Sequence, residues 1–197
     1  MKKKGIKEMD IVFLLDRSGS MSGIEEDTIG GYNSYIESQK ENNVRVTTVL
    51  FDDKYEMLTN RVSVKEVKKL EKEQYYVRGC TALLDAIGKT IKFMDKQNSK
   101  KVMFIITTDG LENASHEYNK SQIKEMIEGH NNWEFMYIGA NIDSYSEGSS
   151  IGINSRNISN YKKDKRGVSN LFKALDKVSC MYYEDAEISD EWKSDLK

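Results

Sequence analysis

Four short apolar runs recur along the chain, and their length and composition predict β-strands. They occupy residues 11–15, 46–51, 102–106 and 135–138. Three of them are almost continuously apolar and do not alternate with polar residues. That pattern is typical of strands buried on both faces, as in a parallel sheet.

Four other segments carry apolar residues three or four positions apart, the spacing of an amphipathic helix. These helices are predicted within residues 29–36, 84–94, 123–127 and 168–178. Strands that alternate with helices form βα units, so we predict an α/β fold with a doubly wound, mostly parallel central sheet. Residues 55–64 follow the second strand too closely for a crossover, which predicts one antiparallel edge strand.

The rest of the chain shows no linker that would divide it into two domains. Residues 65–78 are rich in lysine and glutamate and are interpreted as a charged surface connection. We expect one domain over residues 9–183, followed by an acidic tail over residues 184–197 that frays. Ile188 and Trp192 are four residues apart and offer the alternative that this tail docks through a final turn.

Composition narrows the class of protein. The 197 residues are 38% hydrophobic and 31% charged, as in a soluble globular domain. The net charge of −2 gives no bulk attraction to nucleic acid, and we expect no nucleic-acid partner. The apolar run at 11–15 is too short for a signal peptide or a membrane span, and Cys80 and Cys180 are too few for a disulfide framework. A cytoplasmic protein without a membrane partner is therefore expected.

Polar residues follow two of the predicted strands directly. The sequence Asp16-Arg-Ser-Gly-Ser20 comes after the first strand, and Thr-Thr-Asp109-Gly comes after the third. Open α/β sheets bind ligands just beyond the carboxyl ends of their strands. Thr81 adds a hydroxyl at the start of the helix predicted within residues 84–94.

These side chains together offer only hard oxygen donors. Oxygen donors suit Mg²⁺ or Mn²⁺, and Ca²⁺ as a further alternative, better than zinc or copper. Two carboxylates can at most neutralise a divalent ion, and Mg²⁺ prefers about six oxygens in an octahedron. Water or an outside group must fill the remaining positions, and a carboxylate from a partner is the expected candidate. The predicted metal ligands are Asp16, Ser18, Ser20, Thr81 and Asp109.

The segments DRSGS, GCTALLDAIG and TTDG, in this order, resemble the von Willebrand factor A (vWA) domain and its metal-ion-dependent adhesion site (MIDAS). The resemblance covers roughly residues 9–183. The segment MYIGANIDSYSEGSSIGI also resembles a late strand and helix of small bacterial and phage-type stand-alone members. The family motif is D-x-S-x-S, a threonine and an aspartate, and every position is present here.

The resemblance implies a role for each ligand. Ser18 and Ser20 would bind the metal directly, and Thr81 would do so in a ligand-competent state. Asp16 and Asp109 would act mostly through water. A glutamate or aspartate of a protein partner would complete the coordination, and the strands that end in Asp16 and Asp109 would lie side by side. The family mostly binds proteins without catalytic turnover, so no enzyme activity is expected.

Other polar residues are given structural interpretations. We expect Asp85 to favour the N-terminus of its helix, with a role in orienting Thr81 as the alternative. Asp52 and Asp53 are expected to lie in a solvated turn, with a second layer of residues around the site as the alternative. Cys80 is expected to be a small buried side chain. His116 and His130 have no His or Cys neighbours at metal-ligand spacing, and they are expected to be structural or on the surface. The basic run at 162–166 is expected to be solvated.

Two alternative functions stay open beside a metal-dependent protein-binding module. One is a Mg²⁺-dependent phosphotransferase or phosphatase of the haloacid dehalogenase type, although Ser18 stands where such an enzyme needs a second aspartate. The other is a structural subunit with a vestigial metal site.

Overall fold

The computed structural model describes residues 8–140 and 142–196, and it has one six-stranded sheet at its centre. The strand order is β3-β2-β1-β4-β5-β6, and all neighbouring pairs are parallel except β2 with β3. The strands are β1 (Met9–Asp16), β2 (Val44–Phe51), β3 (Tyr55–Ser63), β4 (Val102–Thr108), β5 (Trp133–Gly139) and β6 (Ile158–Asn160). The predicted α/β fold, with a mostly parallel sheet and one antiparallel edge strand, is confirmed.

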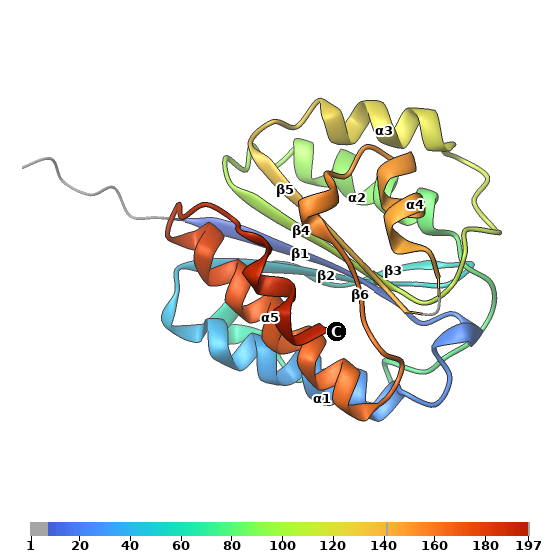
Figure 1. Ribbon diagram of the computed structural model, residues 1–197, viewed down its shortest axis with the longest axis horizontal. Coiled ribbons are helices and arrows are strands. Elements are labelled where there is room, and N and C mark those ends of the chain that lie inside the picture. Colours follow the sequence, from blue (N-terminus) through green and yellow to red (C-terminus); the bar gives the residue numbers. More distant parts are fainter. Residues whose placement is uncertain (1–7, 141, 197) are drawn as a thin grey trace, which may run out of the picture.

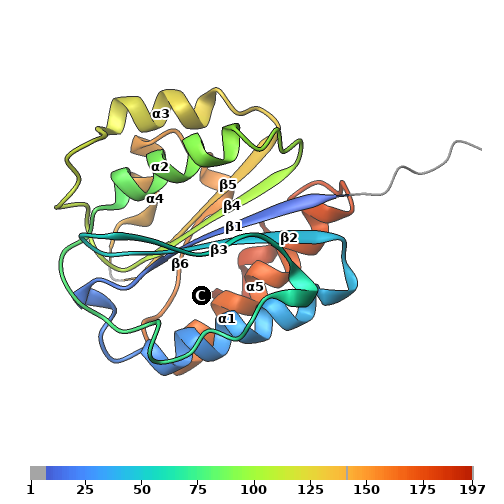
Figure 2. The same cartoon turned by 180° about the vertical axis from the view of Figure 1, so that it is seen from behind.

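Helices cover both faces of the sheet, as Figures 1 and 2 show from opposite sides. On one face α1 lies beside α5, and on the other lie α2, α3 and the short α4. Their bounds are α1 (Glu25–Ser38), α2 (Leu83–Asp95), α3 (Lys120–Glu128), α4 (Ser144–Ser150) and α5 (Lys165–Tyr183). Each of the four helices predicted from apolar spacing is found. None of the helices in the described part of the chain is long and apolar enough to cross a membrane.

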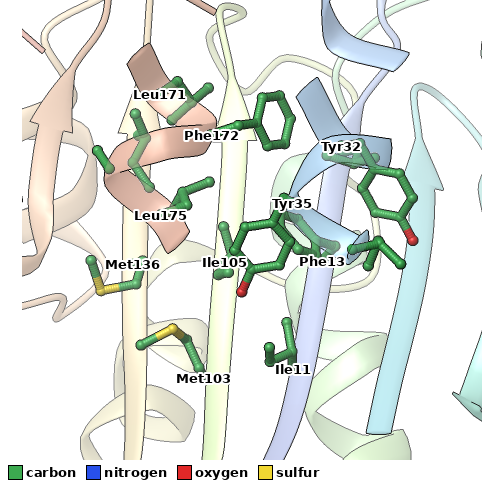
Figure 3. Packing of buried hydrophobic residues seen from close by; sticks show 14 of the residues in the cluster. Ile11, Phe13, Tyr32, Tyr35, Met103, Ile105, Met136, Leu171, Phe172 and Leu175 are labelled. Carbon is green, nitrogen blue, oxygen red and sulfur yellow. The ribbon is translucent and has the colours of Figure 1, made fainter. Parts of the chain in front are cut away.

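An aromatic cluster joins α1 and α5 to the sheet (Figure 3). Phe13 on β1 makes edge-to-face contacts with Tyr32 and Tyr35 of α1, with ring centroids 5.4 and 5.0 Å apart. The hydroxyl groups of both tyrosines are buried and hydrogen-bonded, that of Tyr32 with Thr48 and that of Tyr35 with Ser179, each at 2.6 Å. Packing on both faces therefore holds β1 rigidly at the centre of the sheet.

The connection between β3 and α2 differs from the charged surface loop that we expected. Val67, Leu70 and Tyr75 are buried among the apolar residues of the α1 face. The Tyr75 hydroxyl donates to the backbone carbonyl of Asp16 at 2.6 Å. Three apolar side chains spaced among lysines and glutamates gave no periodic signal, so the sequence pattern concealed this contact.

The acidic C-terminal segment is packed, and the expectation that it frays is wrong. A 3₁₀ segment, η5 (Asp190–Leu196), lies against α5, with the Trp192 side chain 0% exposed. The Trp192 indole N–H donates to the Arg156 carbonyl at 3.1 Å, and Ile188 is also buried. The large apolar side chains thus hold the segment against the domain despite its acidic composition. This outcome matches the alternative in which the tail docks through Ile188 and Trp192. The domain boundary after residue 183 stays a prediction.

Candidate metal centre

The sheet brings the two predicted site loops together because β1 and β4 are neighbours. Their parallel register pairs Leu15 with Thr107, so Asp16 and Thr108 end the two strands at the same level. The loops that follow therefore leave the same edge of the sheet, at the carboxyl ends of its central strands.

Asp16 is buried at the base of the site, and both of its carboxylate oxygens accept hydrogen bonds. The Ser18 backbone N–H donates to Oδ1 and the Thr108 hydroxyl donates to Oδ2, each at 2.6 Å. The pKa of Asp16 is raised to about 6, mainly by burial and to a smaller extent by the nearby Asp109 carboxylate. The hydrogen bonds that Asp16 accepts act in the opposite direction. Asp16 therefore fixes the shape of its loop from within the protein.

Backbone contacts tie the Thr81 loop to the other two. The Gly19 N–H donates to the Gly79 carbonyl at 3.2 Å, and Asn113 exchanges hydrogen bonds with the Thr81 backbone at 2.9 and 3.0 Å. Gly79 has a φ of +65°, and an added Cβ would lie 2.3 Å from the Asp53 carboxylate, so glycine is required there. Three chain segments that are distant in sequence are thereby held in one arrangement.

The three predicted hydroxyl ligands meet beside Gly110. A Cβ atom placed on Gly110 would lie 2.6 Å from Thr81 Oγ1, 2.9 Å from Ser20 Oγ and 3.4 Å from Ser18 Oγ. The two serine hydroxyls are themselves 2.9 Å apart. One small space therefore lies within reach of three oxygen donors from two different loops.

Asp109 completes the cluster, but one of its oxygens is paired with a lysine. Lys163 Nζ lies 2.8 Å from Asp109 Oδ2 and also donates to the Ser20 carbonyl. Asp109 Oδ1 is buried and has no hydrogen-bond partner within the described part of the chain. The expectation that the basic run at 162–166 is solvated is thus wrong for Lys163, whose side chain folds into the site.

A second polar layer supports the D-x-S-x-S loop from the β2 side. The side chain of Arg17, 1% exposed, donates to Asp52 Oδ2 at 3.0 Å, and Arg78 donates to the same oxygen at 2.7 Å. The Arg78 N–H donates to the Arg17 carbonyl at 2.9 Å. Asp52 is therefore a buried, doubly paired carboxylate and not part of the solvated turn that we expected, whereas Asp53 is exposed.

Asp85 lies in the first turn of α2, as expected, but it also has a role that the sequence did not predict, whereas Cys80 differs from its expected position. Asp85 accepts backbone N–H groups of His116, Glu117 and Tyr118, at 3.0, 2.9 and 3.0 Å, and so holds the loop after β4 against α2. Cys80 is exposed beside Thr81 and is not the small buried side chain that we expected. Contacts of this kind join residues about thirty positions apart, and no sequence motif signals them.

The donor set fits a hard divalent cation. Three hydroxyls converge on one space, and Asp109 lines a surface hollow together with them. The Asp109 Oδ1 atom has no hydrogen-bond partner among the described residues. Buried polar oxygens are normally hydrogen-bonded, so an oxygen without a partner is consistent with a missing ligand. Residues 8–140 and 142–196 contain no group of three or more His, Cys, Asp or Glu side chains that could hold a metal, so this candidate depends on its hydroxyls.

The cluster opens to solvent through a hollow of about 400 Å³. Ser18, Ser20, Thr81 and Asp109 line its floor, and Leu111 and Ile142 add apolar side chains to the lining. Leu111 is 56% exposed, an unusual position for a large apolar residue. An outside group can therefore reach the oxygen donors past an apolar edge.

A sheet of this order with such a site defines the class of vWA-type domains, and comparison with known proteins agrees. Residues 1–130 match the family described as VWA domain containing CoxE-like protein, and the chain belongs to that family. No curated protein matches the sequence.

Solved structures show the same fold at low sequence identity. Proximal thread matrix protein 1 of the mussel byssus, in a structure with a zinc-occupied MIDAS motif, is 15% identical with a TM-score of 0.65 over 89% of this chain and 46% of its own. The manganese-loaded TRAP protein of Plasmodium vivax is 19% identical, with a TM-score of 0.61 over 80% of this chain and 69% of its own.

A pilus adhesin, SpaC of Lactobacillus rhamnosus GG, is 14% identical with a TM-score of 0.69. The match covers 92% of this chain and 31% of the adhesin. The chain thus spans less than half the length of the mussel protein and of the adhesin.

Proposed function

We propose that the protein is a metal-dependent protein-binding module whose MIDAS captures a carboxylate of a protein partner. The ligands are those predicted from the sequence: Asp16, Ser18, Ser20, Thr81 and Asp109. A divalent cation held there would supply a positive charge with a free coordination position for an anionic oxygen.

The observation that carries this proposal is the meeting of three hydroxyls beside Gly110, in a hollow that is also lined by Asp109, a residue with one unpartnered oxygen among the described residues. Neutral hydroxyls do not cancel the charge of a cation, so the site retains attraction for an anion. Mg²⁺ or Mn²⁺ is the proposed ion, since both favour oxygen donors. The zinc and manganese named for two structural neighbours support a divalent cation of some kind.

The rim of the hollow favours a protein as the partner. The exposed Leu111 side chain lies beside the charged centre and would contact an apolar group next to the captured carboxylate. A glutamate or aspartate side chain on a folded protein supplies both features. The exposed free thiols of Cys80 and Cys180 are in keeping with a cytoplasmic, reducing location, which is part of the proposal.

Binding without catalysis is the proposed mode of action. A general base must be free to accept a proton from water or substrate. Asp16 already accepts two hydrogen bonds from the protein, and Asp109 is paired with Lys163. The phosphotransferase alternative also needs an acid or base at position 18, where serine stands.

Titration with Mn²⁺ and a pull-down test the two parts of the proposal. Calorimetry with the wild-type chain should give saturable Mn²⁺ binding that Asp16→Ala abolishes. Partner capture from an extract of the source cells should occur in Mg²⁺ and be lost in EDTA. Absence of Mn²⁺ binding would refute the site, and metal-dependent phosphoester hydrolysis that Asp16→Asn abolishes would favour the enzyme.

A further inference from the structure

The contact between Lys163 and Asp109 places a charged side chain of this protein beside its own candidate metal site. Lys163 Nζ lies 2.8 Å from Asp109 Oδ2 and donates to the backbone carbonyl of Ser20. The Asp109 side chain is 1% exposed and that of Lys163 is 21% exposed, so water screens the pair only weakly. Lys163 lies beyond the residues matched to the family, in the loop between β6 and α5.

The neighbouring charges show what the ammonium group does there. Asp16 and Asp109 place two negative charges at the site, and the Asp109 charge acts on Asp16 across the space between them. Arg17 is directed away toward Asp52 and Glu56, so it neutralises other carboxylates. Lys163 is the cation paired with a candidate metal ligand within the described part of the chain. A buried carboxylate without such a partner is costly.

We propose that Lys163 is an internal cation that neutralises Asp109 and competes with the divalent ion for it. This inference rests on the proposed metal site. An ammonium group and a divalent cation that share one carboxylate repel each other at close range. Entry of the ion therefore either brings it close to the Lys163 ammonium group or displaces Lys163 from Asp109, and the energetic cost of either is subtracted from the binding of the metal.

The arrangement has a clear consequence for the domain without its ion. Asp109 keeps a counter-charge at every metal concentration, so the sheet does not depend on the ion for its stability. Because of the same contact, the site fills at a higher metal concentration than it would without Lys163. Lys163 thus lowers the affinity of the site for a divalent ion, through charge and not through coordination.

Three variants of the full chain test this role. Lys163→Met removes the charge and keeps much of the side-chain volume, while Lys163→Arg keeps the charge. Lys162→Met is the matched control, because Lys162 is the adjacent lysine and is exposed. Calorimetric titration should show Mn²⁺ binding about tenfold tighter in Lys163→Met, the effect expected when a partly buried charged contact is removed. Lys163→Arg and Lys162→Met should stay within about twofold of the wild type.

Thermal unfolding gives a second measurement that does not depend on metal affinity. In EDTA, Lys163→Met should melt below the wild type because Asp109 loses its counter-charge, whereas Lys162→Met should not. Saturating Mn²⁺ should then raise the melting temperature of Lys163→Met by more than that of the wild type.

The outcomes separate this inference from the proposed function. Equal or weaker Mn²⁺ binding in Lys163→Met, with clear binding in the wild type, would overturn the role of Lys163 and leave the metal site standing. If neither the wild type nor Lys163→Met binds Mn²⁺, the metal site and this inference fall together.

Discussion

Gly110 provides the space in which the hydroxyls of two loops meet. Since its backbone is not in the left-handed region, an alanine could adopt the same conformation, and only the added methyl group would matter. That methyl group would lie 2.6 Å from Thr81 Oγ1 and 2.9 Å from Ser20 Oγ, closer than carbon and oxygen normally approach. A single added carbon atom at position 110 would therefore occupy the space between the hydroxyls.

Gly110→Ala should therefore abolish Mn²⁺ binding in calorimetry while the circular dichroism spectrum of the fold is kept. Gly30→Ala is the matched control, because a Cβ there meets nothing within 4 Å on the exposed side of α1. The control should keep its Mn²⁺ affinity and gain about 0.5–1 kcal/mol of stability, the usual benefit of alanine over glycine in a helix. Undiminished metal binding by Gly110→Ala would show that the ion lies elsewhere.

Thr81 tests whether its hydroxyl, and not its bulk, serves the site. Thr81→Ala should weaken Mn²⁺ binding about tenfold or more, the cost of losing one ligand of a divalent ion, with a melting temperature close to that of the wild type. Thr81→Ser keeps the hydroxyl and should retain the affinity. Equal titration curves for wild type, Thr81→Ala and Thr81→Ser would remove Thr81 from the ligand set.

Single residues also show where sequence reasoning succeeds and where it fails. The five predicted ligands belong to short local motifs at strand ends and at a helix start, and the structure brings them together. The roles of Lys163 and Arg17 were not predicted, and that of Asp52 was only an alternative, because these roles come from contacts between loops that are tens of residues apart. In the sequence, a lysine within a basic run or an aspartate within a turn gives the same pattern whether its side chain is solvated or buried.

Among the elements, the Asp85 carboxylate is one of the links between α2 and the loop after β4. Burial alone would raise the pKa of Asp85, but the backbone N–H donors of His116, Glu117 and Tyr118 outweigh burial and hold the pKa below its ordinary value. A lowered pKa means that the folded state binds the proton less tightly than the unfolded state does. The stabilisation is therefore present above about pH 4 and is lost as the pH falls through the folded-state value.

Asp85→Asn should lower the free energy of unfolding by about 1–3 kcal/mol at pH 7, since hydrogen bonds to a charged acceptor are lost. Urea unfolding at a series of pH values should show this difference shrinking below about pH 4, as the wild-type carboxylate becomes protonated. Glu125→Gln, which changes an exposed carboxylate on α3, is the control and should show no such trend. A difference that stays constant with pH would contradict the role assigned to Asp85.

Most elements were predictable for a simple reason. The strands β1, β2, β4 and β5 are buried along almost their whole length, and three of them are nearly continuous in apolar residues. The apolar residues of the amphipathic helices recur every three to four positions. The edge strand β3 followed from the short turn before it. By contrast, β6 has only three residues and the 64–78 connection has no period, so neither left a pattern to detect.

On the scale of the whole molecule, the C-terminal segment closes the α5 side of the fold. Trp192 is the largest of the fully buried side chains. Lys177 Nζ donates to the Glu191 carbonyl at 3.1 Å, and Asn170 donates to the Asp195 carbonyl at 2.8 Å. Residues 190–196 are thus part of the stable domain, although their composition is that of a solvated tail.

Trp192→Ala should therefore lower the free energy of unfolding by about 3–5 kcal/mol, as measured by urea denaturation, because a large cavity replaces the indole ring. Trp192→Phe should cost less, since it keeps an aromatic ring and loses the hydrogen bond to Arg156 together with only part of the buried ring volume. A stability of Trp192→Ala equal to that of the wild type would mean that the segment does not contribute to folding.

The position of β1 between β2 and β4 also bears on the order of events as the chain folds. Asp16 and Asp109 are contributed by neighbouring strands, but 92 residues separate Asp16 from Thr108, which holds it. A chain that has left the ribosome only as far as residue 101 carries the D-x-S-x-S motif but lacks β4. The proposed ion could bind only after β4 has joined β1, so its binding free energy would stabilise the completed sheet and no earlier intermediate.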